Sequence, residues 1–260
     1  MRPPAVAGSF YPDDPVILAG TVDGYLSDVR PARTPAPSAL IAPHAGYLYS
    51  GPVAASAFAR LREARGRFDR VLLLGPSHRV AFRGLALPEA DVESFAMPAG
   101  AVPLAKVGDA AIADLPQLIR SNAPHAREHS LEVELPFLQT VLGSFELIPL
   151  AVGEATAEDV AAVIGRLADE RTLVVVSTDL SHYLPYDEAR RVDARTSDAI
   201  ERLDASAIGR DDACGAVPLR GLLVWAHAQG LACERLDLRN SGDTAGPKER
   251  VVGYGAYAFT

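Results

Sequence analysis

Short uninterrupted runs of apolar residues alternate along this chain with segments of helical spacing. The clearest runs are RVLLLG at 70–75, FELIPLAVG at 145–153 and TLVVVST at 172–178. Strands of a parallel sheet have this composition when helices cover both of its faces. The sequence therefore predicts an α/β fold, a single three-layer αβα domain over residues 1–260 whose central sheet is mainly parallel or mixed.

The same patterns give approximate bounds for the other elements. Further strands are expected at 39–42, 84–88, 231–239 and 251–259. Helices are expected at 17–29, 52–65, 108–120, 130–143, 157–170, 186–203 and 213–229. Pro52 is expected near the first helical position, and the Pro-rich stretch 31–38 is expected to end the first helix.

Composition narrows the class of partner. The formal net charge is -8, and no Lys/Arg cluster is long enough to follow a phosphate backbone, so nucleic acid and anionic membranes are not expected partners. No apolar stretch approaches the ~20 residues that span a bilayer. Residues 1–15 lack the apolar core of a signal peptide, which predicts a cytoplasmic protein.

Histidines follow three of the predicted strands. His44, His78 and His182 stand just beyond the runs SALIA, RVLLLG and TLVVVST. Open α/β sheets bind ligands in the crevice beyond the carboxyl ends of their strands, so these imidazoles are expected to share one site. Neutral imidazole is the commonest metal ligand and binds Fe, Zn or Cu.

The other histidines are less constrained. His125 and His129 lie four residues apart in NAPHAREHSLEVELP, a spacing that aligns side chains on one helical face. For His129 a metal-binding or acid–base role and a helix-terminus role are equally supported, whereas His125 is interpreted as structural. His227 is interpreted as an ordinary residue near a helix C-terminus, outside the site.

The cysteines and the common catalytic and nucleotide-binding motifs give little further information about function. Cys214 and Cys233 have no partner at metal-binding spacing, so both are interpreted as idle thiols in a reducing compartment. Asp243 lies in a Ser-Gly-Asp turn, where it is a common turn former. The chain contains no GxxxxGK[ST], GxGxxG, HExxH or GxSxG motif, which disfavours nucleotide-dependent and serine-hydrolase chemistry.

Several segments together resemble a known family. They are AGSFYP, APHAGYLYSGPVAASAF, LLLGPSH, EHSLEVELPFLQ, STDLSHY, NSGDT and VVGYGAYAF, and in this order they span nearly the whole chain. They resemble the Memo-like family, whose bacterial members are called AmmeMemoRadiSam system protein B. The resemblance implies an αβα fold similar to that of the LigB-type extradiol ring-cleaving dioxygenases, with a site at the strand ends.

The resemblance also implies roles for the histidines. The LigB-type dioxygenases hold Fe(II) with two histidines and a carboxylate, and they use a further histidine as acid and base. By similarity, His44 and His78 would bind the metal, with Fe(II) expected and Cu or Zn as alternatives. His182 would be the catalytic acid and base, and His129 would line the same pocket.

The chain departs from the family pattern at the third metal ligand. The pattern of the animal Memo proteins that this chain resembles has a cysteine immediately before an Arg-Asn pair, whereas here that pair follows Leu238. Leucine does not bind metals, so the third ligand would be Asp243, Asp179, Glu128 or water. Asp243 is the residue predicted for this position.

Three functions remain open on the sequence. The first is a metal-dependent oxidoreductase that resembles the extradiol dioxygenases and acts on a small organic substrate. The second, motivated by Leu238, is a non-catalytic binding or accessory protein that kept the cleft but lost the full ligand set. The family name implies that it acts with an AMMECR-type protein and a radical SAM enzyme. The third is a metallohydrolase that uses a metal-activated water.

Overall fold

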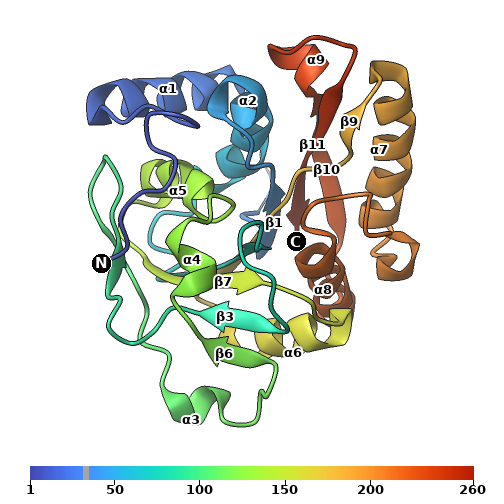
Figure 1. Cartoon of the computed structure of the whole chain (residues 1–260). Coiled ribbons are helices and arrows are strands. Elements are labelled where there is room, and N and C mark those ends of the chain that lie inside the picture. Colours follow the sequence, from blue (N-terminus) through green and yellow to red (C-terminus); the bar gives the residue numbers. More distant parts are fainter. Residues whose placement is uncertain (32–34) are drawn as a thin grey trace.

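A computed structural model describes residues 1–31 and 35–260, and its centre is a β-sheet (Figure 1). The strands are β1 (Ala39–Ala42), β2 (Arg70–Pro76), β3 (Leu85–Leu87), β4 (Ser94–Phe95), β5 (Val102–Pro103), β6 (Leu118–Arg120), β7 (Glu146–Val152), β8 (Thr172–Ser177), β9 (His182–Leu184), β10 (Cys233–Asn240) and β11 (Val251–Phe259). The order in the main sheet is β10-β11-β1-β8-β2-β7-β3-β6, with β9 paired to β11 and a separate β4-β5 hairpin.

The sheet is mixed, with a parallel centre. Strands β1, β8, β2 and β7 are neighbours and run parallel. Strand β11 joins β1 antiparallel, and β3 joins β7 antiparallel. The predicted α/β class with a mainly parallel or mixed sheet is therefore confirmed.

Helices cover both faces of this sheet. They are α1 (Pro15–Asp28), α2 (Tyr47–Phe58), α3 (Asp109–Ile112), α4 (Ala123–Ala126), α5 (Leu135–Leu142), α6 (Ala157–Leu167), α7 (Tyr186–Glu201), α8 (Ala216–Ala228) and α9 (Ser241–Thr244), with short 3-10 turns at Ala59–Leu61, Glu132–Glu134 and Ala205–Ala207. Helices α1, α2 and α5 pack on one face, and α6, α7 and α8 pack on the other (Figure 1).

Each central strand contributes to two cores because successive side chains of a strand point to opposite faces. In β2, Val71 and Leu73 belong to the core under α1, α2 and α5, whereas Leu72 and Leu74 belong to the core under α6, α7 and α8. All four are fully buried. This burial on both faces explains why the strand is an unbroken apolar run in the sequence.

The helix predicted at 108–120 is wrong over most of its length. Only Asp109–Ile112 is helical, and Leu118–Arg120 forms β6, which pairs parallel with β3. Pro116 lacks an amide hydrogen and disfavours a continuous helix through this segment. The exposed edge of β3 then offers Leu118–Arg120 the backbone hydrogen bonds that a helix would have supplied.

Helix α2 begins earlier than predicted, at Tyr47, so that Pro52 lies inside it. Gly51, in the added turn, lets α2 pack closely on α1, because a Cβ atom there would lie 2.6 Å from the ring of Tyr25. Helix α1 ends at Asp28 as expected, but residues 32–34 of the Pro-rich stretch lie outside the described residues. Among the helices that the structure describes, none has the length and apolar character needed to cross a membrane.

Candidate metal centre

The carboxyl ends of three adjacent strands bring the predicted histidines together. Ala42, the last residue of β1, lies opposite Ser177, the last residue of β8, and β2 flanks β8 on the other side. His44 and His78 each follow their strand by two residues. Their ring centroids are consequently 5.3 Å apart.

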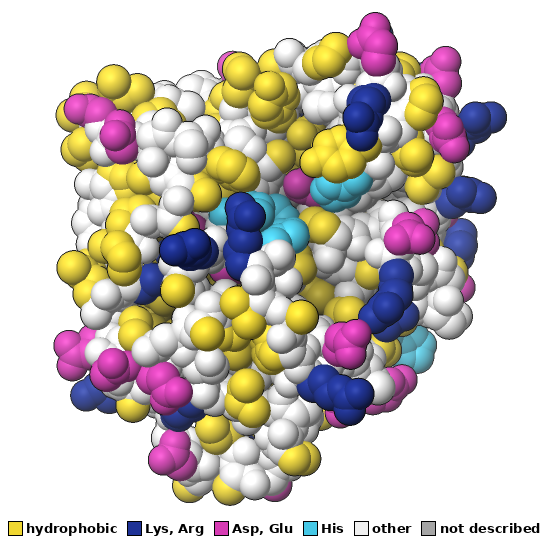
Figure 2. All heavy atoms as spheres, viewed as in Figure 1, with side chains coloured by type: hydrophobic (Ala, Val, Ile, Leu, Met, Phe, Trp, Pro, Cys, Tyr) yellow, Lys and Arg dark blue, Asp and Glu magenta, His cyan; other side chains and the backbone are white. Residues whose placement is uncertain are grey.

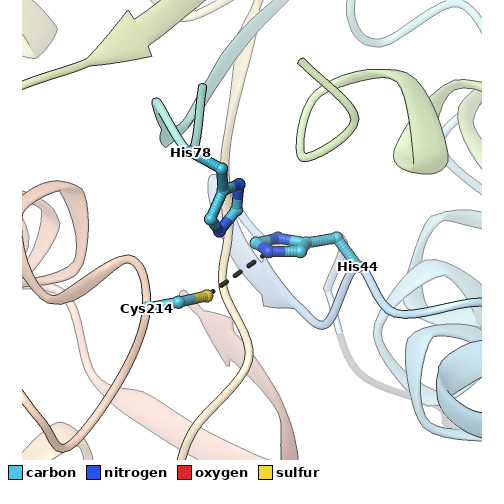
Figure 3. Close-up of side chains that lie close together, drawn as sticks. All are labelled: His44, His78 and Cys214. Carbon is cyan, nitrogen blue, oxygen red and sulfur yellow. Dashed lines mark hydrogen bonds between the residues drawn. The ribbon is translucent and has the colours of Figure 1, made fainter. Parts of the chain in front are cut away.

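A cysteine completes this group. The Sγ atom of Cys214 lies 3.3 Å from Nε2 of His44. One ligand atom from each of Cys214, His44 and His78 lies within 4.8 Å of the other two, and the three side chains point toward one another (Figure 3). The structure thus places a thiol where the sequence predicts a carboxylate or water.

The interpretation of Cys214 as an idle thiol missed this arrangement. Cys214 precedes α8 and follows no strand, so the strand-end pattern that identifies the histidines does not apply to it. Its backbone N–H donates to the carbonyl of Asp179, beyond the end of β8, and this contact joins segments 35 residues apart. Only the following Gly215, whose Cβ would collide with Thr178 at 2.7 Å, hints at a close approach.

His44 is held rigidly in the interior. Its side chain is buried, its Nδ1 lies 2.7 Å from the hydroxyl oxygen of Ser177, and its backbone N–H donates to a carboxyl oxygen of Asp179. Burial, with smaller contributions from neighbouring His78 and His129, lowers the pKa of His44 well below its usual value. The imidazole is therefore neutral, the form that binds metals.

His78 is oriented by Glu128. Its Nδ1–H donates to Oε1 of Glu128 at 2.9 Å, which leaves Nε2 free. Glu128 also accepts the backbone N–H groups of His78, His129 and Ser130. Burial raises the pKa of Glu128, but the hydrogen bond and charge of His78 and the backbone donors outweigh it and lower the pKa to about 2. Glu128 is therefore an ionised carboxylate that fixes the tautomer and orientation of His78.

His129 lies beside His44 and His78. Its ring stacks on that of His78 with centroids 4.6 Å apart and meets Phe10 edge-on at 4.9 Å. Burial lowers the pKa of His129 to about 4. Glu128, His78 and His129 form a second group with close ligand atoms, but the carboxylate in it already accepts four N–H groups.

His182 borders the site from the other side. It begins β9, and its Nδ1–H donates to the carbonyl of Leu180 at 2.8 Å, so that Nε2 carries the free lone pair. Its ligand atom lies within 4.8 Å of those of Cys214 and Asp179. This position next to the thiol fits the predicted acid–base role, which stays a prediction.

Asp193 of α7 anchors the loop that carries His182. It accepts the backbone N–H of Ser181 at 3.0 Å, and burial raises its pKa to about 6. Because the folded pKa exceeds the ordinary value of 3.8, this group stabilises the fold fully below that value, and the stabilisation is lost as the pH rises through about 6.

The change should be about 2–3 kcal/mol between pH 3.5 and 7.5. The variant Asp193→Asn should remove it, so the difference in unfolding free energy between variant and wild type, measured by urea denaturation, should move in favour of the variant as the pH rises. Equal pH dependence in the two proteins would contradict this expectation.

Asp243 and Leu238 lie outside the groups of close ligand atoms found in the described residues. A carboxyl oxygen of Asp243 accepts the N–H of Asn240 at the start of α9, and the other accepts the hydroxyl of Tyr186. Leu238 lies in β10 opposite Gly255 and packs against the core under α6, α7 and α8. The structure therefore gives Asp243 a capping role, and its predicted metal-binding role has no support from geometry.

The site opens to the molecular surface. Histidine side chains are visible at the centre of one face, among hydrophobic and basic side chains (Figure 2). A cleft of about 470 Å³ reaches Cys214 and is lined in part by Ser77, Arg83, Glu154 and Arg210. Cys214 therefore borders a cleft that is open to solvent.

Comparisons with known proteins agree along the whole chain. The family model described as Memo-like protein matches residues 2–258. A MEMO1 family protein of Methanopyrus kandleri is 34% identical over 99% of this chain and 98% of its own length. A MEMO1 family protein of Archaeoglobus fulgidus is also 34% identical, over 100% of this chain and 99% of its own.

A solved structure supports the fold independently. An uncharacterized protein of Escherichia coli K12 superposes with a TM-score of 0.54 at 11% sequence identity, covering 85% of this chain and 98% of its own. At this identity the likeness concerns the fold alone. The family match and the full-length relatives together show that this chain belongs to the Memo-like protein family.

Proposed function

We propose that His44, His78 and Cys214 bind one transition-metal ion and that the centre carries out redox chemistry on a small organic substrate. The observation that carries this proposal is the approach of Cys214 Sγ to His44 Nε2 at 3.3 Å, with His78 beside them. Ligand atoms that share one ion lie roughly 3.3–3.8 Å apart, because metal–nitrogen bonds are near 2.0 Å and metal–sulfur bonds near 2.3 Å. The three side chains fit such an ion with small adjustments.

The donor set is compatible with a redox-active metal. Two imidazoles and one thiolate suit Cu and Zn as well as Fe(II), and the thiolate is softer than the carboxylate that the resemblance implied. Burial and the nearby carboxyl of Asp179 raise the pKa of Cys214 to about 12, so the free thiol is protonated. It must release its proton when it binds a metal, and affinity should therefore weaken as the pH falls.

The chain's own residues supply the rest of the proposed chemistry. A bound Fe or Cu ion would supply the exchange of electrons. His182 keeps a free Nε2 next to Cys214 and is placed to hold or move a proton. His129 packs beside His44 and against Phe10 on the other side of the group. The association with an AMMECR-type protein and a radical SAM enzyme stays a prediction.

Metal titration tests the proposal. The anaerobic protein should bind about one equivalent of Fe(II) or Cu(I), and His44→Ala and His78→Ala should each weaken that binding by at least about 100-fold, since each removes a direct ligand. The exposed His227→Ala is the matched control and should bind as wild type does. Equal binding in all four proteins would overturn the proposed site. Preference for Zn over Fe and Cu, with hydrolysis of an ester or amide, would favour a metallohydrolase.

A further inference from the structure

The hydroxyl of Ser177 touches three polar atoms at once. Its Oγ lies 2.6 Å from the backbone carbonyl of Ser130, 2.7 Å from Oε1 of Glu134 and 2.7 Å from Nδ1 of His44. All four residues are buried. A hydroxyl has one hydrogen to donate and two lone pairs to accept with, so the positions of the protons follow from counting.

The carbonyl of Ser130 determines where the hydroxyl hydrogen of Ser177 points. It can only accept, so at 2.6 Å it must receive the single hydroxyl hydrogen of Ser177. The two remaining neighbours must then both donate. His44 donates through Nδ1–H, and Glu134 donates through a carboxylic acid O–H. An ionised Glu134 would take the hydroxyl hydrogen and leave two acceptor oxygens, of Ser177 and Ser130, in repulsive contact.

We propose that Ser177, whose hydroxyl hydrogen goes to the carbonyl of Ser130, fixes His44 as the Nδ1–H tautomer with the Nε2 lone pair facing Cys214, and that Glu134 is a buried neutral acid which donates to the same hydroxyl. Glu134 and Ser177 are then positioning residues for a metal ligand. The assignment of a metal rests on the proposed function above, but the proton arrangement belongs to the protein alone.

The surroundings of Glu134 support the neutral form. Its side chain is fully buried, and its Oε2 has no hydrogen-bond partner among the residues that the structure describes. An unpartnered oxygen costs far less in a neutral acid than in a carboxylate. Burial is the main cause that raises the pKa of Glu134 well above its usual value, and the charge of Asp179 raises it further.

The two imidazole ligands are therefore held by carboxyl groups in opposite states. Glu128, which accepts four N–H groups, is ionised and receives the Nδ1–H of His78 directly. Glu134 receives no N–H group from the part of the chain described and reaches His44 through a hydroxyl. One ligand is paired with a negative charge and the other is not, which makes His78 the more electron-rich donor.

The metal-free protein gives the first test. Long-range nitrogen–proton NMR should show His44 as a pure Nδ1–H tautomer. The infrared difference between wild type and Glu134→Gln should contain the carbonyl band of a protonated carboxyl group. Glu134→Gln should keep the tautomer because its amide can donate to Ser177 as the acid does. Ser177→Ala should lose the tautomer because Nδ1–H loses its acceptor.

Metal affinity gives the second test, with Co(II) as the spectroscopic probe. Ser177→Ala and Glu134→Leu should each weaken binding about 10- to 100-fold, whereas Glu134→Gln should stay within about 3-fold of wild type. The control is Ser50→Ala, which removes another buried hydroxyl; it donates to the backbone carbonyl of Ala45 and has no hydrogen bond to a histidine among the described residues.

The outcomes separate this inference from the proposed function. Three results would each overturn the proposed proton arrangement. They are an Nε2–H or mixed tautomer of His44 in the metal-free protein, a missing carboxylic acid band, and loss of the tautomer in Glu134→Gln. A wild-type protein that shows the tautomer and the band but binds no metal would refute the metal site and leave the proton arrangement intact.

Discussion

Replacing Cys214 with alanine is expected to weaken metal binding by at least about 100-fold, more than the loss of an outer-shell residue. Cys214 supplies the only sulfur near the two imidazoles within the described residues, and its Sγ is 3.3 Å from Nε2 of His44. Its removal leaves two nitrogen ligands, too few for a stable site. Titration with Cu(I) and Fe(II) under anaerobic conditions measures the change.

Cys233→Ala is the matched control. Cys233 is also a free, partly buried cysteine whose pKa is raised to about 12 by burial, but it begins β10, away from the histidines. The Cys233→Ala variant should bind metal as the wild type does. Both variants should remain folded, because each loses one small side chain. If Cys214→Ala bound metal normally, the third ligand would have to be another residue or water, and the proposed donor set would be wrong.

The variant Glu132→Ala should lower the free energy of unfolding by about 3–5 kcal/mol. Glu132 is fully buried and pairs with the guanidinium of Arg2 at 2.7 Å. It also accepts the backbone N–H groups of Ala5 and Val6 and the hydroxyl of Tyr11. Without Glu132 the buried hydroxyl of Tyr11 would be left without its partner, the partly buried N–H groups of Ala5 and Val6 would lose their acceptor, and the charge of the buried Arg2 would lose its counterion.

Urea denaturation at neutral pH measures this loss. Glu63→Ala, which removes an exposed glutamate, is the control and should change stability by less than about 0.5 kcal/mol. Arg2→Met should cost less than Glu132→Ala, because the carboxylate would keep the hydrogen bonds from Ala5, Val6 and Tyr11. A loss below about 1 kcal/mol in Glu132→Ala would show that these contacts do not hold the N-terminal segment.

This anchor also reaches the candidate site. The guanidinium of Arg2 donates to the backbone carbonyls of His125 and Glu128, on the segment that carries His129. Segment 1–11 is thereby tied to the loop that orients His78. His125 itself has the structural role expected, since its Nε2–H donates to the carbonyl of Ala86 at 2.9 Å.

The local residue pattern was sufficient to predict the strands in the parallel centre of the sheet. The predicted strand at 39–42 coincides with β1, that at 251–259 coincides with β11, and RVLLLG and TLVVVST differ from β2 and β8 by one residue. These strands are buried on both faces, so their composition is almost purely apolar and is hard to confuse with a helix. The short β6 and β9 lack this signal because their side chains are partly exposed.

The same reasoning explains which site residues the sequence could identify. His44, His78 and His182 follow strands that it predicts correctly, and parallel neighbours end at one edge of the sheet, so their convergence follows from topology. His129 was left open because its segment passes over that edge without being part of the sheet.

The sequence by itself determined the α/β class, the strands of the parallel centre and the edge where the histidines gather, because these depend on residue patterns within a few positions of one another. Only the tertiary structure decided the third member of the site. Cys214 reaches His44 across 170 residues, through packing of the segment before α8 against the end of β8. Tertiary contacts likewise surround Glu128 with N–H donors, which keep it ionised beside His78, and bury Glu134 away from any N–H donor of the described residues. The difference arises because the cost of a buried charge depends on the donors that distant segments bring to it.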